Sequence, residues 1–196
     1  FYALRQSRTA VAASVAAIAA NVLFSIFLVS LMGFRGLALA GSIAAIKQLK
    51  DAGYKIIIIS NQSGVARGLI SEDMLQTIDK LIHRQILNGG AHVDGSYYCP
   101  HHPEHGVYPY RQACECRKPH TGLIKKAVKD HDIDLARSIM VGDHSTDIET
   151  AKRAVIKSVF VLTGHGPEEK ANLKSQPDHI AADITAAADW IVKKGN

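Results

Sequence analysis

The chain has 196 residues, of which 47% are hydrophobic and 21% are charged, as in a single globular domain. The formal net charge is +5, but residues 1–40 hold three arginines and no acidic residue, so the other 20 basic and 18 acidic residues leave only +2. This balance, without a basic stripe, argues against binding to nucleic acid or to a membrane through bulk charge.

The first forty residues differ from the rest of the chain. Residues 9–34 carry no charge, and the apolar run 10–34 is long enough to span a bilayer. Arg5 and Arg8 before it, with the small residues near Ala40, also fit a secretory leader. A buried Ala-rich helix followed by a strand is a third interpretation. The abrupt change of composition favours a fourth, an upstream reading-frame error, so we expect residues 1–40 to be an atypical head.

From residue 41 onward, apolar strands alternate with amphipathic helices. The pattern predicts helices at 41–53, 71–90, 121–131, 145–155 and 181–194, and strands at 55–60, 93–98, 138–142 and 158–164. Ser71 and Ser145 are expected to cap two of these helices. The alternation predicts an α/β domain over residues 41–196, with a Rossmann-like parallel sheet and helices on both of its faces.

Polar side chains follow two of the predicted strands. Ser60, Asn61 and Gln62 end one strand, and Asp143 directly follows another. In a parallel sheet, ligands bind beyond the carboxyl ends of the strands, so these side chains are expected on one rim. A carboxylate there suits Mg²⁺. Alone, each residue could merely cap a turn or face a helix N-terminus.

A second segment supplies positive charge. Arg117 and Lys118 combine a planar guanidinium with a compact ammonium, the usual partners of a phosphoryl group. Together with the rim residues, they predict a phosphate site.

Three cysteines, Cys99, Cys114 and Cys116, lie in a histidine-rich segment. An odd, clustered set argues against a disulfide framework and for metal ligation in a reducing compartment. With one histidine the cysteines would form a closed tetrahedral site for structural Zn²⁺ in a loop at 99–116. Spacing alone allows His101, His102 or His105 as the fourth ligand, and unliganded thiols are the alternative.

Four stretches, ISNQSGVARG, YYCPHH, CECRKPHTG and MVGDHSTD, together resemble the haloacid-dehalogenase-like phosphatases. The resemblance spans residues 41–166. Within this family, the four stretches are most similar to the branch that contains heptose-1,7-bisphosphate 7-phosphatases and histidinol phosphatases. It implies a Rossmann-like core, hydrolysis through an aspartyl-phosphate with Mg²⁺, lipopolysaccharide-precursor synthesis in the cytoplasm, and His101 as the zinc ligand.

The resemblance also implies roles for individual residues. The implied set is Ser60 for a phosphate hydrogen bond, Asn61, Gln62 and Ser63 for the substrate loop, Arg117 and Lys118 for substrate and phosphate charge, and Asp143 for Mg²⁺. His144 stands where the heptose enzymes commonly have a substrate-contacting lysine, so that contact departs from the pattern.

Other residues have weaker predicted roles. Asp147 either orients Lys118 or favours the N-terminus of its helix. Arg67 could reach a second phosphate, although an exposed loop position is the simpler interpretation. Residues 164–166 are expected to form a turn without catalytic weight.

The family's D-x-D-G-[TV] motif, which holds its nucleophile, is absent, because the first acidic residue is Asp51. Without that carboxylate there is no phosphoryl acceptor, and the Mg²⁺ site is incomplete. We therefore predict that this polypeptide has negligible phosphatase activity. The alternatives are a non-catalytic phosphosugar-binding protein and a relative of histidinol-phosphate phosphatase.

The expected partner is a small phosphorylated sugar. We expect no nucleic-acid partner, no membrane contact unless residues 10–34 are a genuine span, and a monomer.

Overall fold

The computed structural model describes residues 34–195. The chain divides into two compact units, residues 1–42 and 43–196. The interpretations of the apolar run 10–34 therefore fall outside the described residues, apart from its last residue. No helix within the described part is long and apolar enough to cross a membrane.

The first described helix, α2, runs from Phe34 to Asp51 and so begins earlier than the predicted start at residue 41. Residues 37–40 are leucines and alanines, which favour helix, and no proline interrupts them. The predicted end at Gly53 is close to the observed one, since Gly53 has a φ of +87° that suits a glycine after a helix.

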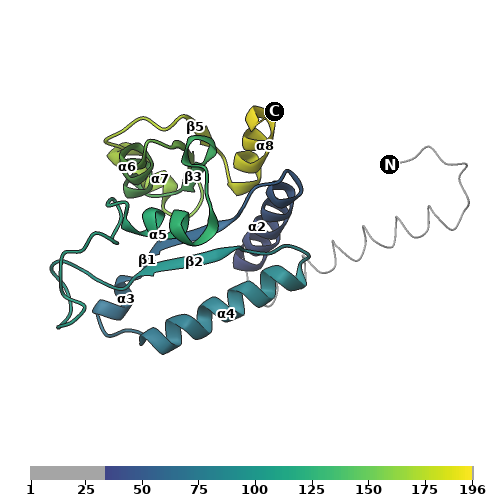
Figure 1. The fold of residues 1–196 in the computed structure, drawn as a ribbon. Coiled ribbons are helices and arrows are strands. Elements are labelled where there is room, and N and C mark those ends of the chain that lie inside the picture. Colours follow the sequence, from purple (N-terminus) through teal and green to yellow (C-terminus); the bar gives the residue numbers. More distant parts are fainter. Residues whose placement is uncertain (1–33, 196) are drawn as a thin grey trace, which may run out of the picture. The chain divides into compact units, whose positions relative to one another are not determined.

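Two parallel strands form the first sheet (Figure 1). Strand β1 (Ile57–Asn61) pairs with β2 (Gly95–Cys99) from Ile57 opposite Gly95 to Asn61 opposite Cys99. Helices α3 (Ser63–Ala66) and α4 (Glu72–Asn88) form the crossover between the strands. Ser71 caps α4 as predicted, because its side chain accepts a hydrogen bond from the N–H of Met74 at 3.1 Å.

Three parallel strands form the second sheet, in the order β3-β4-β5. The strands and the helices around them follow in this order along the chain: α5 (Gly122–His131), η1 (Leu135–Arg137), β3 (Ile139–Gly142), α6 (Ser145–Ala154), β4 (Lys157–Val161), α7 (Gly166–Glu169), η2 (Lys170–Asn172), β5 (His179–Ala181) and α8 (Ile184–Gly195).

The predicted cap of α6 is wrong: His144, not Ser145, is its N-cap. Ser145 is already helical, since the carbonyl of His144 accepts from the N–H of Asp147 at 3.0 Å.

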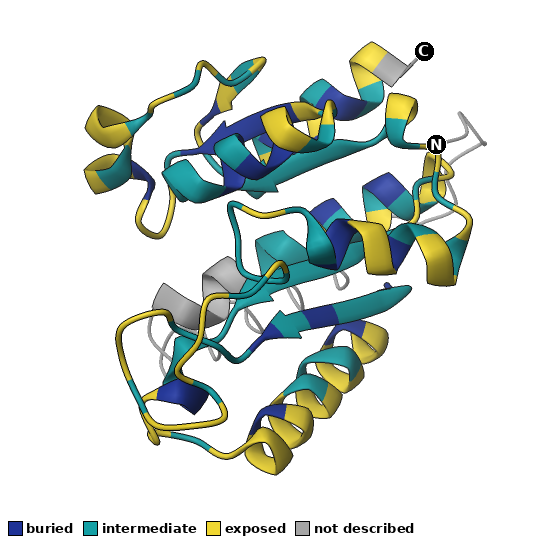
Figure 2. Cartoon of the chain, turned by 60° about the vertical axis from the view of Figure 1, so that its left-hand side comes forward, coloured by how far each residue is buried: buried dark blue, intermediate teal, exposed yellow. Residues whose placement is uncertain are grey.

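Helices cover both faces of the strands, which confirms the predicted α/β class (Figure 2). On one face, Ala45 and Leu49 of α2 pack into the core cluster that contains Val159 and Val161 of β4. The isoleucines at 56–59, the last three of which lie in β1, alternate between two clusters. Ile56 and Ile58 pack with α4 and α2, whereas Ile57 and Ile59 pack toward Leu123 and Ala127 of α5. This alternation is the two-residue period expected of a strand.

The strands form two sheets, where the sequence predicted one. Within the described residues, β1 pairs with β2 alone and β3 pairs with β4 alone. The carbonyl of Ile56 accepts from Asp94 N at 2.8 Å, and Gln62 N donates to Cys99 O at 2.7 Å, so even-numbered residues of β1 face β2. Since backbone groups alternate along a strand, Ile59 directs its carbonyl to the open edge.

Candidate functional site

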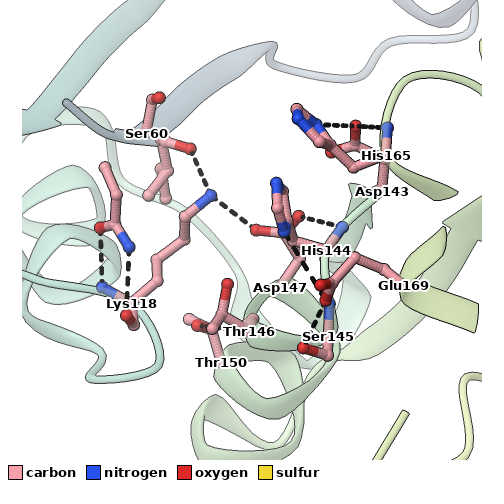
Figure 3. A network of polar contacts seen from close by, with 12 residues as sticks. Ser60, Lys118, Asp143, His144, Ser145, Thr146, Asp147, Thr150, His165 and Glu169 are labelled. Atoms are coloured by element: carbon pink, nitrogen blue, oxygen red, sulfur yellow. Dashed lines mark hydrogen bonds and ion pairs between the residues drawn. The ribbon is translucent and has the colours of Figure 1, made fainter. Parts of the chain in front are cut away.

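Lys118 reaches the carboxyl end of β1 from the loop before α5. Its ammonium donates to the carbonyl of Ile59 at 3.1 Å and to Oδ1 of Asp147 at 2.5 Å (Figure 3). The two side chains are only 12% and 5% exposed. A charge-assisted hydrogen bond in such a site is strong and directional. Lys118 is therefore fixed across the gap between the end of β1 and the start of α6.

Asp147 makes both of its predicted contacts. One carboxylate oxygen holds Lys118, and the other accepts a hydrogen bond from the N–H of His144 at 3.1 Å. Gly142 makes this approach possible, because a Cβ at that position would lie 2.2 Å from Oδ2 of Asp147. The glycine that ends β3 thus lets the first turn of α6 lie against the strand.

Asn61 clamps the backbone of Lys118. Its Oδ1 accepts from Lys118 N at 2.9 Å, and its Nδ2 donates to Lys118 O at 3.1 Å. Both ends of the amide are thus engaged with the chain itself. The structure gives Asn61 a positioning contact, whereas the sequence predicted a contact with substrate.

The other residues at the end of β1 also bond within the protein. Gln62 donates through Nε2 to Oγ of Ser60 at 3.1 Å, so the Ser60 hydroxyl proton is free to be directed at a phosphate oxygen. Ser63 opens the short helix α3. Arg117 donates through Nη1 to the carbonyl of His101 at 2.9 Å, and Arg67 is exposed.

A second polar group surrounds Asp143 at the end of β3 (Figure 3). Oδ2 of Asp143 accepts from the N–H of His165 at 2.9 Å and lies 3.5 Å from Nδ1 of the same histidine. The ring centroids of His144 and His165 lie 4.5 Å apart, and the planes of the two imidazoles make an angle of 34°. The sequence expectation that residues 164–166 form an inert turn missed this approach, because 22 residues separate His165 from Asp143 and no spacing signals it.

Glu169, also missed in the sequence, supports this group from α7. Its Oε2 accepts from Ser145 N at 3.0 Å and Ser145 Oγ at 2.7 Å, and it lies 3.6 Å from Nδ1 of His144. The Ser145 hydroxyl, with the Ser145 N–H, lowers the pKa of Glu169 below its usual value. Glu169 is therefore a carboxylate that faces His144.

The cysteine segment brings four potential ligand atoms together. Sulfur–sulfur distances are 3.5 Å for Cys99–Cys114 and 3.1 Å for both Cys114–Cys116 and Cys99–Cys116. Nδ1 of His101 lies 3.4 Å from the Cys116 sulfur. Ligands about 2.3 Å from one tetrahedral ion lie roughly 3.8 Å apart, so small shifts would suit a metal. The cluster can hold a metal ion with no ligand position left open.

The structure also separates the alternative histidines. Nδ1 of His102 accepts hydrogen bonds from the N–H groups of Glu104 and His105, at 3.1 and 3.0 Å, and so serves its own turn. The fourth member of the cluster is His101.

The thiols differ in acidity. Burial, with the Cys116 and Cys114 thiols, raises the pKa of Cys99. Burial also disfavours the Cys114 thiolate, but hydrogen bonds from Cys116 and Cys99 outweigh it and lower the pKa of Cys114. Of these two thiols, Cys114 is the one that ionises more readily.

Comparison with known proteins identifies the class of this fold and site. Residues 115–187 match the profile of the HAD-hydrolase-like family. The parallel α/β fold, with a lysine and aspartates gathered beyond the strand ends, defines a protein of that class.

The chain is 41% identical over 145 residues to D-glycero-beta-D-manno-heptose-1,7-bisphosphate 7-phosphatase of Pasteurella multocida, which covers 74% of this chain and 77% of that protein. It is 37% identical over 153 residues to the enzyme of the same name from Salmonella typhi, covering 78% and 74%. The chain belongs to the family of these heptose-bisphosphate phosphatases.

Solved structures agree. D,D-heptose 1.7-bisphosphate phosphatase from B. bronchiseptica, complexed with magnesium and phosphate, superposes with a TM-score of 0.69 at 32% identity, over 79% of this chain and 83% of that one. The corresponding phosphatase from Burkholderia thailandensis gives a TM-score of 0.58 at 25% identity, over 77% and 84%.

Proposed function

We propose that this chain carries the substrate-binding scaffold of a Mg²⁺-dependent phosphatase that releases the 7-phosphate of D-glycero-D-manno-heptose 1,7-bisphosphate. The observation that carries the proposal is the position of Lys118 beyond the end of β1. Its ammonium donates to Asp147 and to the carbonyl of Ile59, and its backbone is bonded to the side chain of Asn61. This is where an anionic ligand binds in a parallel α/β fold. As part of the same proposal, we extend the relatives' activity to this chain. That activity implies a cytoplasmic location.

The roles of the phosphate-site residues follow from their contacts. The Ser60 hydroxyl, oriented by Gln62, donates to a phosphate oxygen, and Lys118 offsets the phosphate charge. Arg117, which is tied to the carbonyl of His101, keeps further guanidinium N–H groups for the sugar or its phosphate. Asp143 supplies a hard oxygen for Mg²⁺, which would neutralise charge on the phosphoryl group when bound.

The cysteine cluster has a structural part in this proposal. Zn²⁺ bound by Cys99, His101, Cys114 and Cys116 would leave no position for water, and so it would order the loop without taking part in the reaction. The loop leads directly into Arg117 and Lys118. Zinc would therefore fix the two cations relative to the end of β1.

The proposal includes a loss of turnover. Phosphoryl transfer through an acyl phosphate needs a carboxylate nucleophile beside the phosphate, and residues 1–50 contain neither Asp nor Glu. The polypeptide of this sequence would then bind phosphate without hydrolysing it. The second candidate function, a phosphosugar-binding protein without activity, is supported by the same observation.

A chimaera tests the family function separately from the loss of turnover. Residues 1–40 are replaced by the amino-terminal segment that precedes the matched region in the Pasteurella multocida enzyme. We expect the chimaera to release phosphate from heptose 1,7-bisphosphate with Mg²⁺, and Lys118→Ala in the chimaera to abolish release. Histidinol phosphate serves as the competing substrate. The phosphatase proposal would be contradicted if the chimaera bound both substrates but released phosphate from neither.

The unmodified chain tests the predicted inactivity. We expect calorimetry to show that it binds inorganic phosphate, and that Lys118→Ala weakens binding. We expect phosphate release from heptose 1,7-bisphosphate no higher than that of its Lys118→Ala variant. Release well above this control would refute the loss of turnover and leave the family function intact.

A further inference from the structure

Asp143, His144 and His165 form a group of which the proposed phosphate site uses only Asp143. One potential ligand atom from each lies within 4.8 Å of the others. Mg²⁺ binds through oxygen, so the proposed phosphate site uses the carboxylate of Asp143 and gives no role to the two imidazoles beside it.

The distances suit a single ion with small adjustments. Oδ2 of Asp143 and Nδ1 of His165 lie 3.5 Å apart. Two donors about 2.1 Å from one tetrahedral ion lie roughly 3.4 Å from each other. The side chains of Asp143, His144 and His165 are 32%, 43% and 65% exposed, so both imidazoles can turn toward an ion that enters from solvent.

A supporting carboxylate orients one imidazole. Oε2 of Glu169 lies 3.6 Å from Nδ1 of His144, and two hydrogen bonds from Ser145 hold that oxygen in place. When Nδ1 faces a carboxylate, Nε2 is left as the ligand atom, and this arrangement recurs around metal-bound histidines. Glu169 acts here as a positioning residue.

The backbone permits the close approach of the third residue. Gly164 has a φ of +62°, and a Cβ there would lie 2.2 Å from Oδ2 of Asp143. The positive φ favours glycine, and the missing Cβ leaves room for Asp143 beside the loop after β4. The two segments are thus joined by backbone geometry as well as by the hydrogen bond from His165 N.

We propose that Asp143, His144 and His165 form a binding site for a divalent transition-metal ion, distinct from the cysteine cluster. Two imidazoles and one carboxylate favour Co²⁺, Ni²⁺ or Zn²⁺ over Mg²⁺, which prefers oxygen ligands and keeps its water. Three protein ligands leave coordination positions for water or a phosphate oxygen. The site shares Asp143 with the proposed function but does not rest on turnover.

Cobalt titration of zinc-loaded protein tests the proposal. One equivalent of Zn²⁺ first fills the cysteine cluster, and Co²⁺ is then added while absorption and heat are recorded. We expect one equivalent of Co²⁺ to bind, with a spectrum that lacks sulfur-to-cobalt charge transfer. His144→Ala and His165→Ala should each weaken Co²⁺ binding about tenfold or more, which is the loss of one ligand.

The control is His92→Ala, since His92 precedes β2 and is exposed. It should bind Co²⁺ as the unchanged protein does, and a tenfold excess of Mg²⁺ should not displace the cobalt. The proposal is overturned if no second equivalent of metal binds, if the double variant His144→Ala/His165→Ala binds Co²⁺ equally well, or if a tenfold excess of Mg²⁺ displaces Co²⁺. None of these outcomes depends on a phosphatase assay.

Discussion

The two ends of strand β1 use charged residues in different ways. At the amino end, Lys50 donates to both oxygens of Asp94, at 2.9 and 2.8 Å, and Oδ2 of Asp94 also accepts from Ile56 N at 2.6 Å. At the carboxyl end, Lys118 is held by Asp147 and Ile59, and Asp143 lies nearby with two histidines. At the amino end, the lysine and the aspartate are paired with each other. At the carboxyl end, Asp143 and two histidines lie in addition to an ion pair that is already formed.

This difference separates stabilising charges from functional ones. A carboxylate that accepts from a lysine and a backbone N–H at once serves the connection between strands. Charged side chains gathered beyond the carboxyl ends of parallel strands are typical of a ligand site. Substitutions at the two ends should therefore differ in what they change, and the following experiments proceed from the largest expected effect to the smallest.

Removal of metal from the cysteine cluster should have the largest effect. At a zinc concentration about 100,000-fold above the dissociation constant, binding stabilises the fold by about 7 kcal/mol. We expect a chelator to lower Tm and to increase amide exchange in the loop at 99–116. Cys116→Ser should show no response to zinc, and His102→Ala should keep it. A full zinc response in Cys116→Ser would contradict the assigned ligand set.

Lys118→Met should destabilise the carboxyl end, because it leaves the buried carboxylate of Asp147 without its cation. Loss of one partner of a buried ion pair lowers the free energy of unfolding by about 3–5 kcal/mol. Urea unfolding of the variant measures this loss. The double variant Lys118→Met/Asp147→Asn should recover part of this loss. The exposed pair Lys47–Asp51 is the matched control, and Lys47→Ala should cost less than about 0.5 kcal/mol. Equal losses of stability in the Lys118 and Lys47 variants would contradict the difference between the buried and the exposed ion pair.

Asp94→Asn should weaken the amino end by about 1–3 kcal/mol, because it weakens a charged bond to Lys50 and the acceptor for Ile56 N–H. Burial opposes the charge of Asp94, but Lys50 and Ile56 outweigh it and hold the pKa of Asp94 below its usual value.

The sign of the pH effect follows from this shift. The contribution of Asp94 is complete above its unfolded pKa, about 3.9, and is lost as pH falls through the lower folded pKa. Unfolding measured between neutral and acidic pH should show a smaller acid-induced loss in Asp94→Asn than in the unchanged protein. An identical pH dependence in the two proteins would contradict the shift.

The smallest effect concerns Tyr98 on β2. Burial and a 2.6 Å hydrogen bond to Asp79 raise the pKa of Tyr98 to about 12. Asp79→Asn should lower that pKa with little change in stability. Titration of a ¹³C-labelled ring by NMR measures it, and an unchanged pKa in the variant would show that Asp79 contributes nothing.

Much of this structure follows from local sequence pattern. Strand β1 and the Ser71 cap of α4 were predicted because their signals lie within a few consecutive residues, and the cysteine cluster because its ligand types gather between residues 99 and 116. The elements β5, α3 and α7 were not predicted, since three or four residues are too few to show periodicity.

The rim was predicted only in part. The pair Lys118–Asp147 was anticipated, but His165 and Glu169 reach their partners through a loop whose path depends on Gly164. The division into two sheets was also missed, because an apolar strand does not show in sequence which neighbour it will pair with.

The open edges of β1 and β3 have a consequence for folding cooperativity. Within residues 34–195, no strand pairs with either edge, and the ammonium of Lys118 bonds to the Ile59 carbonyl on one of them. An unpaired strand edge presents N–H and C=O groups with which another extended backbone can pair. A backbone that paired with both edges would turn two small sheets into one of six strands, which would unfold as a unit.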